Sequence, residues 1–523
     1  MKTEKIKNGQ TYLGIELGST RIKACLIDDT YSPIANGSYE WENAFDGKYW
    51  TYSLDSIHTG VRECFKSLCD DVMKKYNITL ETIGGMGISA MMHGYLAFDK
   101  NDNLLVPFRT WRNTVTEDAS EKLTQLFNFN IPQRWSIAHL YQAILNNEPH
   151  VSQIAYITTL SGYIHYLLTG KHEIGIGDAS GIFPLEENDY NSKMLDKFRV
   201  LVKENQYEWD IKDILPKIKS AGEGGSYLTE SGAKFLDPTG NLKTNILVCP
   251  PEGDAGTGMV ATNAVSPKSG NISAGTSVFS MLVLEKQLKN TYPEIDIVAT
   301  PDGFPVAMVH CNNCCNELDT WVNIFDEFSR LLGVNTDKST LYELLYKTAM
   351  TGNCTGIIAY NYLSGEHITQ IKNGKPLYFR LPEVKMTLAG FVKAQLYSSV
   401  TALSIGMDIL FNKEKIHADK FSAHGGLFKV EGVAQQILAN ALNTPISVMT
   451  TAGEGGAWGM ALLSAFASEK TTLPLNQWLD EKVFSNLEIS VLTPQEKGTQ
   501  EFENYKKLYK SGLNAEFGLE EVR

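Results

Sequence analysis

Apolar and β-branched residues are grouped in short runs, and one arrangement of these runs occurs twice. Residues 11–28, TYLGIELGSTRIKACLID, have the pattern of a strand, a tight turn and a second strand. Residues 270–285, GNISAGTSVFSMLVLE, have the same pattern. The two turns, Gly18-Ser19-Thr20 and Gly275-Thr276-Ser277, lie about half of the chain apart. We therefore predict two domains of similar architecture, each opening on a hairpin.

Helical spacing of apolar residues follows the second hairpin. Residues 317–332, ELDTWVNIFDEFSRLL, place apolar side chains three or four positions apart, which predicts an amphipathic helix with Asn313 or Asn316 as its N-cap. Residues 495–517, QEKGTQEFENYKKLYKSGLNAEF, predict a further helix with a solvated, charged face. No chemistry is assigned to that face.

Composition narrows the class of protein. The chain has 523 residues, which exceeds one core and predicts two large or three small domains. Its net charge of −13 argues against general nucleic-acid binding, which needs a basic face. No run approaches the roughly 20 apolar residues of a membrane helix, and no signal peptide is evident. The eight cysteines are expected to be reduced cytosolic thiols, and a cytoplasmic location is expected.

The two glycine-hydroxyl turns have the chemistry of anion sites. Glycine allows a ligand to approach the backbone closely, and successive N–H groups in a tight turn form an anion-binding concavity. Two hydroxyls per turn add further donors. Either turn alone is also compatible with an ordinary hairpin. Their occurrence at matching places in the two halves favours a pair of turns that clamps a polyphosphate across a cleft.

Other nucleotide motifs are absent or out of context. The chain has no GxxxxGK[ST] sequence, hence no Walker A loop. Residues 256–261 match the dinucleotide pattern GxGxxA, and Glu285 follows at a suitable distance. However, residues 250–254, PPEGD, separate this match from the preceding strand, and Pro267 leaves little room for a crossover helix. We therefore disfavour an NAD site.

Asp254 is the candidate general base. It is predicted to lie in a glycine-rich turn that follows the apolar run 245–249, NILVC, after residues 250–253. A carboxylate at the carboxyl end of a strand faces the position where α/β proteins bind ligands. There it could accept a proton from a substrate hydroxyl during phosphoryl transfer. The alternative is a helix cap, which aspartate also favours.

Taken together, these motifs resemble the FGGY carbohydrate kinases, a family of the actin-like ATPase superfold. Members begin with a strand ending in D-x-G-T-S, which residues 16–20 resemble. Further similar segments occur in the family's order at 87–94 (GISAMMHG), 169–170 with 178–181 (TG and DASG), 253–255 (GDA), 275–277 (GTS), 362–366 (YLSGE), 425–426 (GG) and 454–461 (EGGAWGMA). The resemblance spans roughly residues 11–470 and leans toward xylulokinase-like pentulose kinases.

The resemblance implies an α/β fold of two actin-like ATPase (ribonuclease H-like) domains with an interdomain catalytic cleft. Residues 11–265 would form the N-terminal sugar-binding and catalytic-base domain. Residues 266–470 would form the C-terminal nucleotide-binding domain, with residues 471–523 as a tail packed on it.

The resemblance also implies residue roles in an ATP-dependent reaction. Asp254 would be the catalytic base, and Mg²⁺ would lie near Glu16 and Asp254. The sugar would contact Met92, His93, Trp111, Arg112 and Asp254. ATP would contact Gly18, Ser19, Thr20, Gly275, Thr276, Ser277, Asn316, Gly425 and Gly426. For His93 the alternative is a buried structural histidine.

Departures from the family pattern fall in the half that should bind sugar. Glu16 stands where the family usually has Asp, and Met91 replaces the usual Gln. Asn113 and Val115 stand where W-x-D-x-R has its Asp and Arg. The first expectation for the substrate is a ketopentose such as xylulose, with glycerol, gluconate or another ketose as alternatives. Arg112 could instead face a sugar acid.

Two functions from other classes stay open at this point. One is a superfold relative that hydrolyses ATP for motion or chaperoning, and the other is a non-catalytic sugar or nucleotide sensor. A homodimer is a prior expectation only.

The stretch 310–321, HCNNCCNELDTW, holds three cysteines and a histidine within six residues. The favoured interpretation is small-residue packing beside the ATP site, because cysteine is small and readily buried. A structural zinc site would need a second paired cluster. A redox-sensitive thiol cluster is the remaining alternative.

Overall fold

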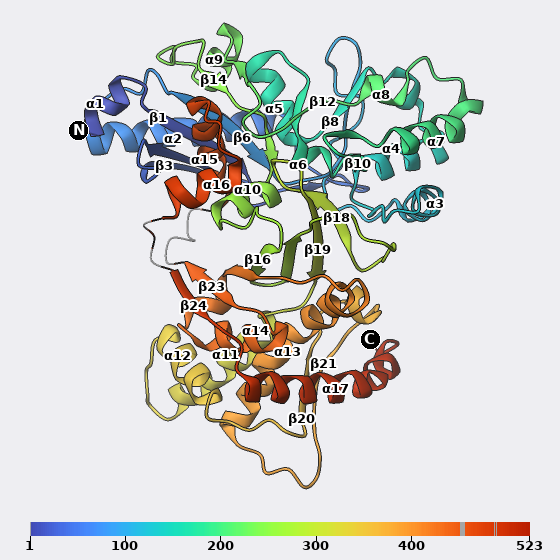
Figure 1. The fold of residues 1–523 in the computed structure, drawn as a ribbon, viewed down its shortest axis with the longest axis vertical. Helices are drawn as coiled ribbons and strands as arrows, with labels where there is room; N and C mark the ends of the chain where they lie inside the picture. Colours follow the sequence, from blue (N-terminus) through green and yellow to red (C-terminus); the bar gives the residue numbers. More distant parts are fainter. Residues whose placement is uncertain (1, 450–454, 486, 488, 523) are drawn as a thin grey trace. The chain divides into compact units, whose positions relative to one another are not determined.

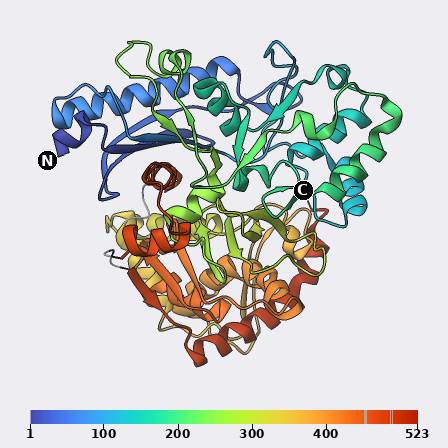
Figure 2. The ribbon, with the colours of Figure 1, turned by 45° about the horizontal axis from the view of Figure 1, so that its top comes forward.

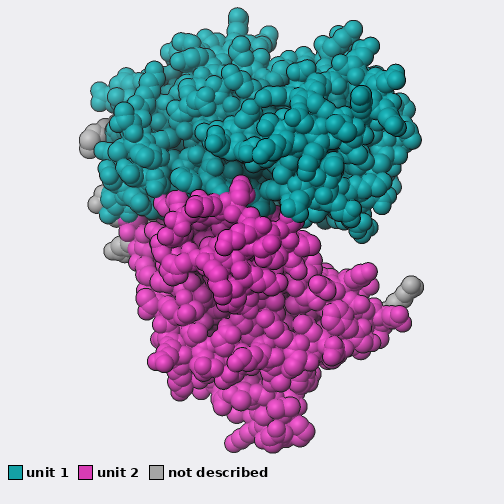
Figure 3. Space-filling model, turned by 45° about the vertical axis from the view of Figure 1, so that its right-hand side comes forward, with its two compact units in different colours: residues 1–265, 297–306, 453–486 teal, residues 266–296, 307–452, 487–523 magenta. Residues whose placement is uncertain are grey.

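The computed structural model describes residues 2–449, 455–485, 487 and 489–522. The chain divides into two compact units, each assembled from separate stretches of sequence (Figure 3). The first unit comprises residues 1–265, 297–306 and 453–486, and the second comprises residues 266–296, 307–452 and 487–523. Each unit is built around its own mixed α/β sheet.

The sheet of the first unit runs in the order β13–β14–β6–β1–β2–β3, and β15 also pairs with β6. The predicted hairpin at 11–28 is confirmed as β1 (Thr11–Leu17) and β2 (Arg21–Asp28), which pair antiparallel. The other strands are β3 (Pro33–Glu40), β6 (Gly85–Ala90), β13 (Ser226–Tyr227), β14 (Leu247–Val248) and β15 (Glu252–Gly253). Both β1 and β15 run parallel to β6, which gives the three strands a common carboxyl-terminal edge.

Two long helices cover opposite faces of this sheet: α2 (Leu54–Tyr76) and α15 (Gly455–Glu469) (Figures 1 and 2). A Cβ on Gly37 would lie 2.4 Å from the Cys64 carbonyl oxygen of α2. A Cβ on Gly14 would lie 2.1 Å from the Ala457 carbonyl oxygen of α15. Successive residues of a strand point to opposite faces, and the β1–β2–β3 register places Gly14 and Gly37 on different ones. Glycine on each face therefore allows a helix backbone to touch the sheet.

The position of α15 differs from the sequence-based division of the chain. The sequence places residues 266–470 together with residues 471–523 packed on them, whereas α15 and residues 297–306 and 471–486 belong to the first unit. For α15 the reason is steric complementarity between its small residues and the glycines of the first sheet. A Cβ on Gly459 would lie 2.0 Å from the Thr257 carbonyl oxygen of α10 (Asp254–Ala261).

The sheet of the second unit contains β19–β17–β16–β22–β23–β24 in that order. The predicted hairpin at 270–285 is confirmed as β16 (Ser269–Ala274) and β17 (Val278–Val283). The other strands are β19 (Pro305–Cys311), β22 (Lys420–His424), β23 (Ile446–Met449) and β24 (Ile489–Leu492). The main helices are α11 (Asn316–Leu331), α12 (Lys338–Ala349), α13 (Leu388–Asp408), α14 (Val433–Leu442) and α17 (Glu496–Leu519).

Both predicted helices of the second unit are present, as α11 and α17, but the predicted cap of α11 is wrong. Cys315 occupies the N-cap position, without a side-chain cap hydrogen bond. Asn316 is already the first helical residue, and the Asn313 side chain instead accepts the N–H groups of Leu363 and Ser364. In the described part of the chain, no helix combines the length and apolar character needed to cross a membrane.

Gly14→Ala tests the close approach of α15 to the first sheet. The new methyl group would meet a helix backbone, which cannot move aside as a flexible side chain can. We expect a loss of about 1–3 kcal/mol of stability, measured as a lower thermal midpoint. Gly224→Ala is the matched control, since a Cβ there meets nothing within 4 Å. Equal midpoints for the two variants would contradict the packing described.

Candidate active site

The carboxyl-terminal edge of the first sheet gathers most of the predicted residues of that unit. In the parallel register Leu17 pairs with Ala90, and Ala90 pairs with Gly253. The residues that directly follow these strand ends are the turn 18–20, the segment 91–93 and Asp254. Strand ends in parallel register meet at one edge, where α/β folds bind ligands. The sheet therefore brings these three predicted elements together.

Asp254 is the first residue of α10 rather than part of a glycine-rich turn. Its Oδ1 accepts the N–H of Met92 at 3.1 Å and the N–H of Ala255 at 3.0 Å. Surrounding protein raises the pKa of Asp254, although solvent limits the rise because the side chain is exposed. The carboxylate is thus oriented by backbone and open to a substrate. Gly256 and Gly258 lie inside α10, so the GxGxxA match forms no dinucleotide turn.

Glu16 lies near Asp254, at the end of β1. Desolvation raises the pKa of Glu16 to about 7, and the neighbouring Asp254 carboxylate raises it further, whereas Lys23 and the Ala457 N–H oppose the rise. Two carboxylates held near each other repel when both are ionised, and a divalent cation would remove that repulsion. Carboxylate oxygens are the ligands that Mg²⁺ prefers. The donor set therefore fits Mg²⁺.

His93 has a strained backbone in addition to its place in the motif. Its φ of 69° is in the left-handed region, which is uncommon for residues other than glycine and clusters at functional sites. The imidazole is buried, its Nδ1 lies 3.4 Å from the Gly181 carbonyl oxygen, and its ring stacks with Trp135 at 6.3 Å. Burial lowers the pKa of His93 well below its usual range, so the ring is neutral at pH 7. Sugar contact by Met92 and His93 stays a prediction.

The first glycine-hydroxyl turn, Gly18-Ser19-Thr20, is held through its three carbonyl groups. Trp41 Nε1 donates to the Gly18 carbonyl oxygen at 2.7 Å, and the Trp41 N–H donates to the Thr20 carbonyl oxygen at 3.2 Å. The Tyr52 hydroxyl donates to the Ser19 carbonyl oxygen at 2.6 Å, and the Trp41 and Tyr52 rings stack at 4.2 Å. With its carbonyl groups satisfied on this side, the turn is well suited to present N–H groups and hydroxyls to an anion.

Trp111 and Arg112 lie on an exposed loop beside the hairpin β4 (Ala44–Phe45) and β5 (Trp50–Thr51). The Arg112 guanidinium lies 4.3 Å from the centre of the Trp50 ring and donates to Asn43 Oδ1 at 3.1 Å. No described contact joins Trp111 or Arg112 to Met92, His93 or Asp254, so their substrate roles stay predictions.

Asn113 is structural in this loop. Its side chain is buried, accepts the Trp50 N–H at 2.8 Å and donates to the Trp50 carbonyl oxygen at 2.9 Å. An amide can both donate and accept in this way, whereas an ionised aspartate can only accept. The departure from the family's Asp at this position therefore has a physical explanation.

Two further carboxyl groups lie behind Asp254. Asp178 is fully buried, accepts the hydroxyls of Thr159 and Ser161, and has one oxygen, Oδ1, without a partner among the described residues. Glu252 is buried and accepts the N–H groups of Gly177 and Asp178, which ties β15 to α6 (Ile176–Ala179). Burial raises the pKa of Asp178 to about 7 and that of Glu252 to about 8.

The second glycine-hydroxyl turn, Gly275-Thr276-Ser277, is also held through carbonyl groups. The Cys315 N–H donates to the Gly275 carbonyl oxygen and the Cys314 N–H to the Thr276 carbonyl oxygen, both at 3.0 Å. Because β16 and β22 run parallel, their ends bring this turn to the same edge as Gly425. Gly425 has φ of 111°, and a Cβ there would lie 2.2 Å from the Ala274 carbonyl oxygen, so this position requires glycine.

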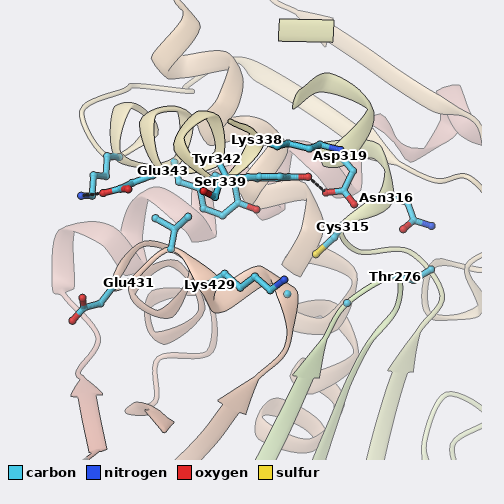
Figure 4. A pocket seen from close by; sticks show the side chains of 15 residues that line it. Thr276, Cys315, Asn316, Asp319, Lys338, Ser339, Tyr342, Glu343, Lys429 and Glu431 are labelled. Atoms are coloured by element: carbon cyan, nitrogen blue, oxygen red, sulfur yellow. Dashed lines mark hydrogen bonds and ion pairs between the residues drawn. The ribbon is translucent and has the colours of Figure 1, made fainter. Parts of the chain in front are cut away.

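A hollow of about 700 Å³ lies at this edge of the second unit (Figure 4). Four predicted residues line it: Gly275, Thr276, Asn316 and Gly426. Ser277 and Gly425 are not among its lining residues. The lining also includes Cys315, Asp319, Lys338, Ser339, Tyr342, Glu343, Tyr346, Lys347, Lys429, Val430 and Glu431. The hollow thus combines backbone of a glycine turn, lysines and aromatic rings, a lining suited to a nucleotide.

Behind the hollow, the YLSGE segment supports the second turn. The fully buried Glu366 accepts the N–H groups of Asn312 and Asn313, the residues that precede Cys314. The Asn313 side chain binds back to residues 363 and 364. Among the described residues, no group of three or more His, Cys, Asp or Glu side chains is arranged to hold a metal ion. Cys311, Cys314 and Cys315 are buried small side chains beside the hollow.

Comparison with protein families gives two matches that together cover most of the chain. Residues 11–254 match the N-terminal domain of the FGGY family of carbohydrate kinases, and residues 270–468 match its C-terminal domain. The chain belongs to the FGGY family of carbohydrate kinases. It is therefore an ATP-dependent sugar phosphotransferase with the two-domain, actin-like fold predicted from its sequence.

Individual relatives of this FGGY kinase are distant. A xylulose kinase of Haemophilus influenzae is 22% identical over 485 residues, which cover 87% of this chain and 90% of the relative. The structure of a ligand-bound xylulose kinase from Lactobacillus acidophilus is 17% identical, with a TM-score of 0.76 and coverage of 98% and 99%. A gluconate kinase structure from the same species is 18% identical, with a TM-score of 0.77 and coverage of 98% of each chain. At these identities the structures support the fold alone.

Several residues of the candidate site are not predicted by the sequence patterns. Trp41 and Tyr52 carry no local signal, because they act on a turn more than 20 residues away through side chains. Asp178 and Glu366 lie within motif segments but were given no role. Lys338 and Lys429 line the hollow from elements whose adjacency only the fold reveals. Glu454, in the segment 454–461, lies outside the described residues.

Tyr52→Phe tests the support of the first phosphate turn. The variant removes one hydrogen bond to the Ser19 carbonyl oxygen and leaves the ring stacking in place. We expect the KM for ATP to rise about 3–10-fold with a smaller change in the KM for sugar, from steady-state kinetics. Tyr76→Phe is the control, since its hydroxyl donates to the distant Ile34 carbonyl oxygen. A similar effect of both variants would argue against a role in the turn.

Glu252→Gln tests the buried carboxyl pair. Since burial raises the pKa of Glu252 from 4.5 to about 8, its contribution to stability is present below about pH 4.5 and is lost as pH rises toward 8. The wild-type chain should lose about 2–4 kcal/mol more than the variant between about pH 5 and pH 8. Thermal midpoints across this range give the slopes, with the exposed Glu208→Gln as control. Parallel slopes for all three proteins would contradict the shift.

Proposed function

We propose that this FGGY kinase transfers the γ-phosphoryl group of ATP to a hydroxyl of a small neutral sugar, with a ketopentose such as xylulose as the first candidate. The observation that carries the proposal is the Asp254 carboxylate, held by the Met92 N–H on the strand edge that also carries the turn 18–20. The xylulose kinase relatives support the choice of sugar, and only at low identity.

Asp254 acts as the general base in this proposal. Its Oδ1 is engaged by the two N–H groups of Met92 and Ala255. The other oxygen, Oδ2, accepts the proton of the substrate hydroxyl as the new oxygen–phosphorus bond forms and the β–γ bridge bond breaks. Phosphoryl transfer asks little covalent chemistry of the protein, so one positioned carboxylate suffices.

Glu16 and Asp254 would hold Mg²⁺, consistent with their hard oxygen donors and their mutual electrostatic repulsion. When bound, the ion would neutralise charge on the phosphate oxygens. Glu16 is one methylene longer than the family's Asp, and its acceptance of the Ala457 N–H draws its carboxylate toward the start of α15. The contact with the Ala457 N–H offers a structural reason why glutamate can replace the family's aspartate at position 16.

The second unit would bind the nucleotide in the hollow at the edge of β16. Gly275 and Thr276 offer backbone to the phosphates, and Gly426 leaves room for adenosine, because no atom lies within 4 Å of a Cβ built there. Lys338 and Lys429 are exposed cations on the lining that could pair with phosphate oxygens.

Electrostatics favour a neutral sugar over a sugar acid. The Asp254 carboxylate raises the pKa values of both Glu16 and Asp178, so it lies within electrostatic range of each. A substrate carboxylate placed there would meet like charge. Arg112, the cation that the sequence suggested for a sugar acid, is engaged by the Trp50 ring and Asn43. Gluconate is therefore the comparator in the test below.

A coupled ADP-release assay tests the proposal with Mg²⁺, ATP and a panel of ketopentoses, ketohexoses, polyols and gluconate. We expect turnover to depend on one neutral sugar and Asp254→Asn to lower kcat by about 10²–10⁴. Asp196→Asn, an exposed carboxylate change in the same unit, is the control. A loss below tenfold with the preferred sugar would reject Asp254 as base, and preferential turnover of gluconate would reject the neutral substrate.

A further inference from the structure

The two adjacent thiols of the HCNNCC stretch lie where the nucleotide hollow meets the second phosphate turn. The Cys314 and Cys315 sulfur atoms are 3.6 Å apart. Cys315 lines the hollow, and its sulfur points into it (Figure 4). Cys314 lies behind it and is almost completely buried. One thiol of the pair is thus accessible from the hollow, and its neighbour is within reach.

The peptide unit between these two cysteines is anchored on both sides. Its carbonyl group, from Cys314, accepts the Asn361 side-chain amide at 3.0 Å. Its N–H group, from Cys315, donates to the Gly275 carbonyl oxygen at 3.0 Å. This single peptide unit therefore connects Asn361 to the carbonyl group of Gly275, the first residue of the second phosphate turn.

We propose that Cys314 and Cys315 form a thiol-modification site that a low-molecular-weight disulfide closes to a vicinal disulfide, with weaker ATP binding as the result. The inference rests on the proposed function in one respect, the assignment of the hollow to ATP.

The chemistry proceeds in two balanced exchanges. The Cys315 thiol first attacks the disulfide RSSR, which gives a mixed disulfide at Cys315 and releases one RSH. The Cys314 thiol then displaces the second RSH and forms the Cys314–Cys315 bond. The protein loses two electrons and two protons, and RSSR is reduced to two RSH. Contact with Cys315 and burial raise the pKa of Cys314 well above its usual range, so the second exchange is the slower one and depends on the 3.6 Å separation of the two sulfur atoms.

Strain in the Cys314–Cys315 disulfide would be transmitted to the second phosphate turn through the backbone. Adjacent Cα atoms are about 3.8 Å apart across a trans peptide, shorter than the roughly 4.4–6.8 Å of most disulfides. Ring closure must therefore twist the peptide unit between the two cysteines. The same peptide unit provides the N–H group for Gly275 and the carbonyl for Asn361, so the twist breaks both hydrogen bonds. Strained disulfides are also easily reduced, which makes the modification reversible.

The test treats the whole chain with glutathione disulfide and then with dithiothreitol. Intact mass and non-reducing peptide mapping should find the loss of two hydrogens and a bond between Cys314 and Cys315. The Kd for a non-hydrolysable ATP analogue should rise at least about tenfold on oxidation and recover on reduction. Cys314→Ser and Cys315→Ser should each lose the reversible change relative to their own reduced state. Cys354→Ala, at a buried cysteine elsewhere in the unit, should retain it.

Three results would overturn the inference. The first is the absence of a mapped Cys314–Cys315 bond, and the second is a bond from Cys311 in its place. The third is a mapped bond with unchanged affinity for the analogue. All three are read without sugar turnover, so they are distinct from failure of the kinase proposal, which the reduced protein tests in the ADP-release assay.

Discussion

The parallel pairing of β1, β6 and β15 is the constraint on which the first half of the site depends. Register in a parallel ladder fixes which residues share a level, and here it aligns Leu17, Ala90 and Gly253. The residues that follow the three strands therefore lie at the same level along the strand direction. The hydroxyl pair of Ser89 and Thr257, 2.9 Å apart, holds β6 to α10 just below that level. The position of Asp254, the proposed general base, is consequently set by backbone register and by the Met92 N–H that its carboxylate accepts.

Both glycine-hydroxyl turns, 18–20 and 275–277, are held through their carbonyl groups, by donors of different kinds. A carbonyl oxygen that faced an anion would repel it, and these hydrogen bonds direct the carbonyl groups to the supporting residues. In the first unit the donors are the indole and backbone of Trp41 and the hydroxyl of Tyr52. In the second unit they are the backbone N–H groups of Cys314 and Cys315. The two halves are thus similar in the glycine and hydroxyl residues of the turns themselves. The residues that bind the carbonyl groups of the turns share no sequence pattern.

Local patterns predicted the local parts of the structure. The two hairpins, α11 and α17 follow from alternation and helical spacing, which depend on neighbours in sequence. The cap of α11 was mispredicted because Asn313 binds the distant residues 363 and 364, a tertiary contact that outweighs its capping preference. The same limit applies to Trp41 and Tyr52, whose importance arises only when the chain folds back on the turn. Asn113 shows the opposite case, in which a departure from a family motif is explained by two hydrogen bonds to one backbone residue.

The return of α15 to the first sheet has a consequence for biosynthesis. The glycines at 14, 85 and 87 all face this helix, and a Cβ on each would meet its atoms within 3 Å. During translation that face of the sheet stays uncovered until residues 455–469 have left the ribosome, after most of the second unit has been made. The first unit therefore completes its core late, although it begins the chain, and the second unit follows with β24 and α17. For hundreds of residues of synthesis the native helix is not available to cover this apolar sheet face, and exposed surface of this kind favours aggregation and the binding of chaperones.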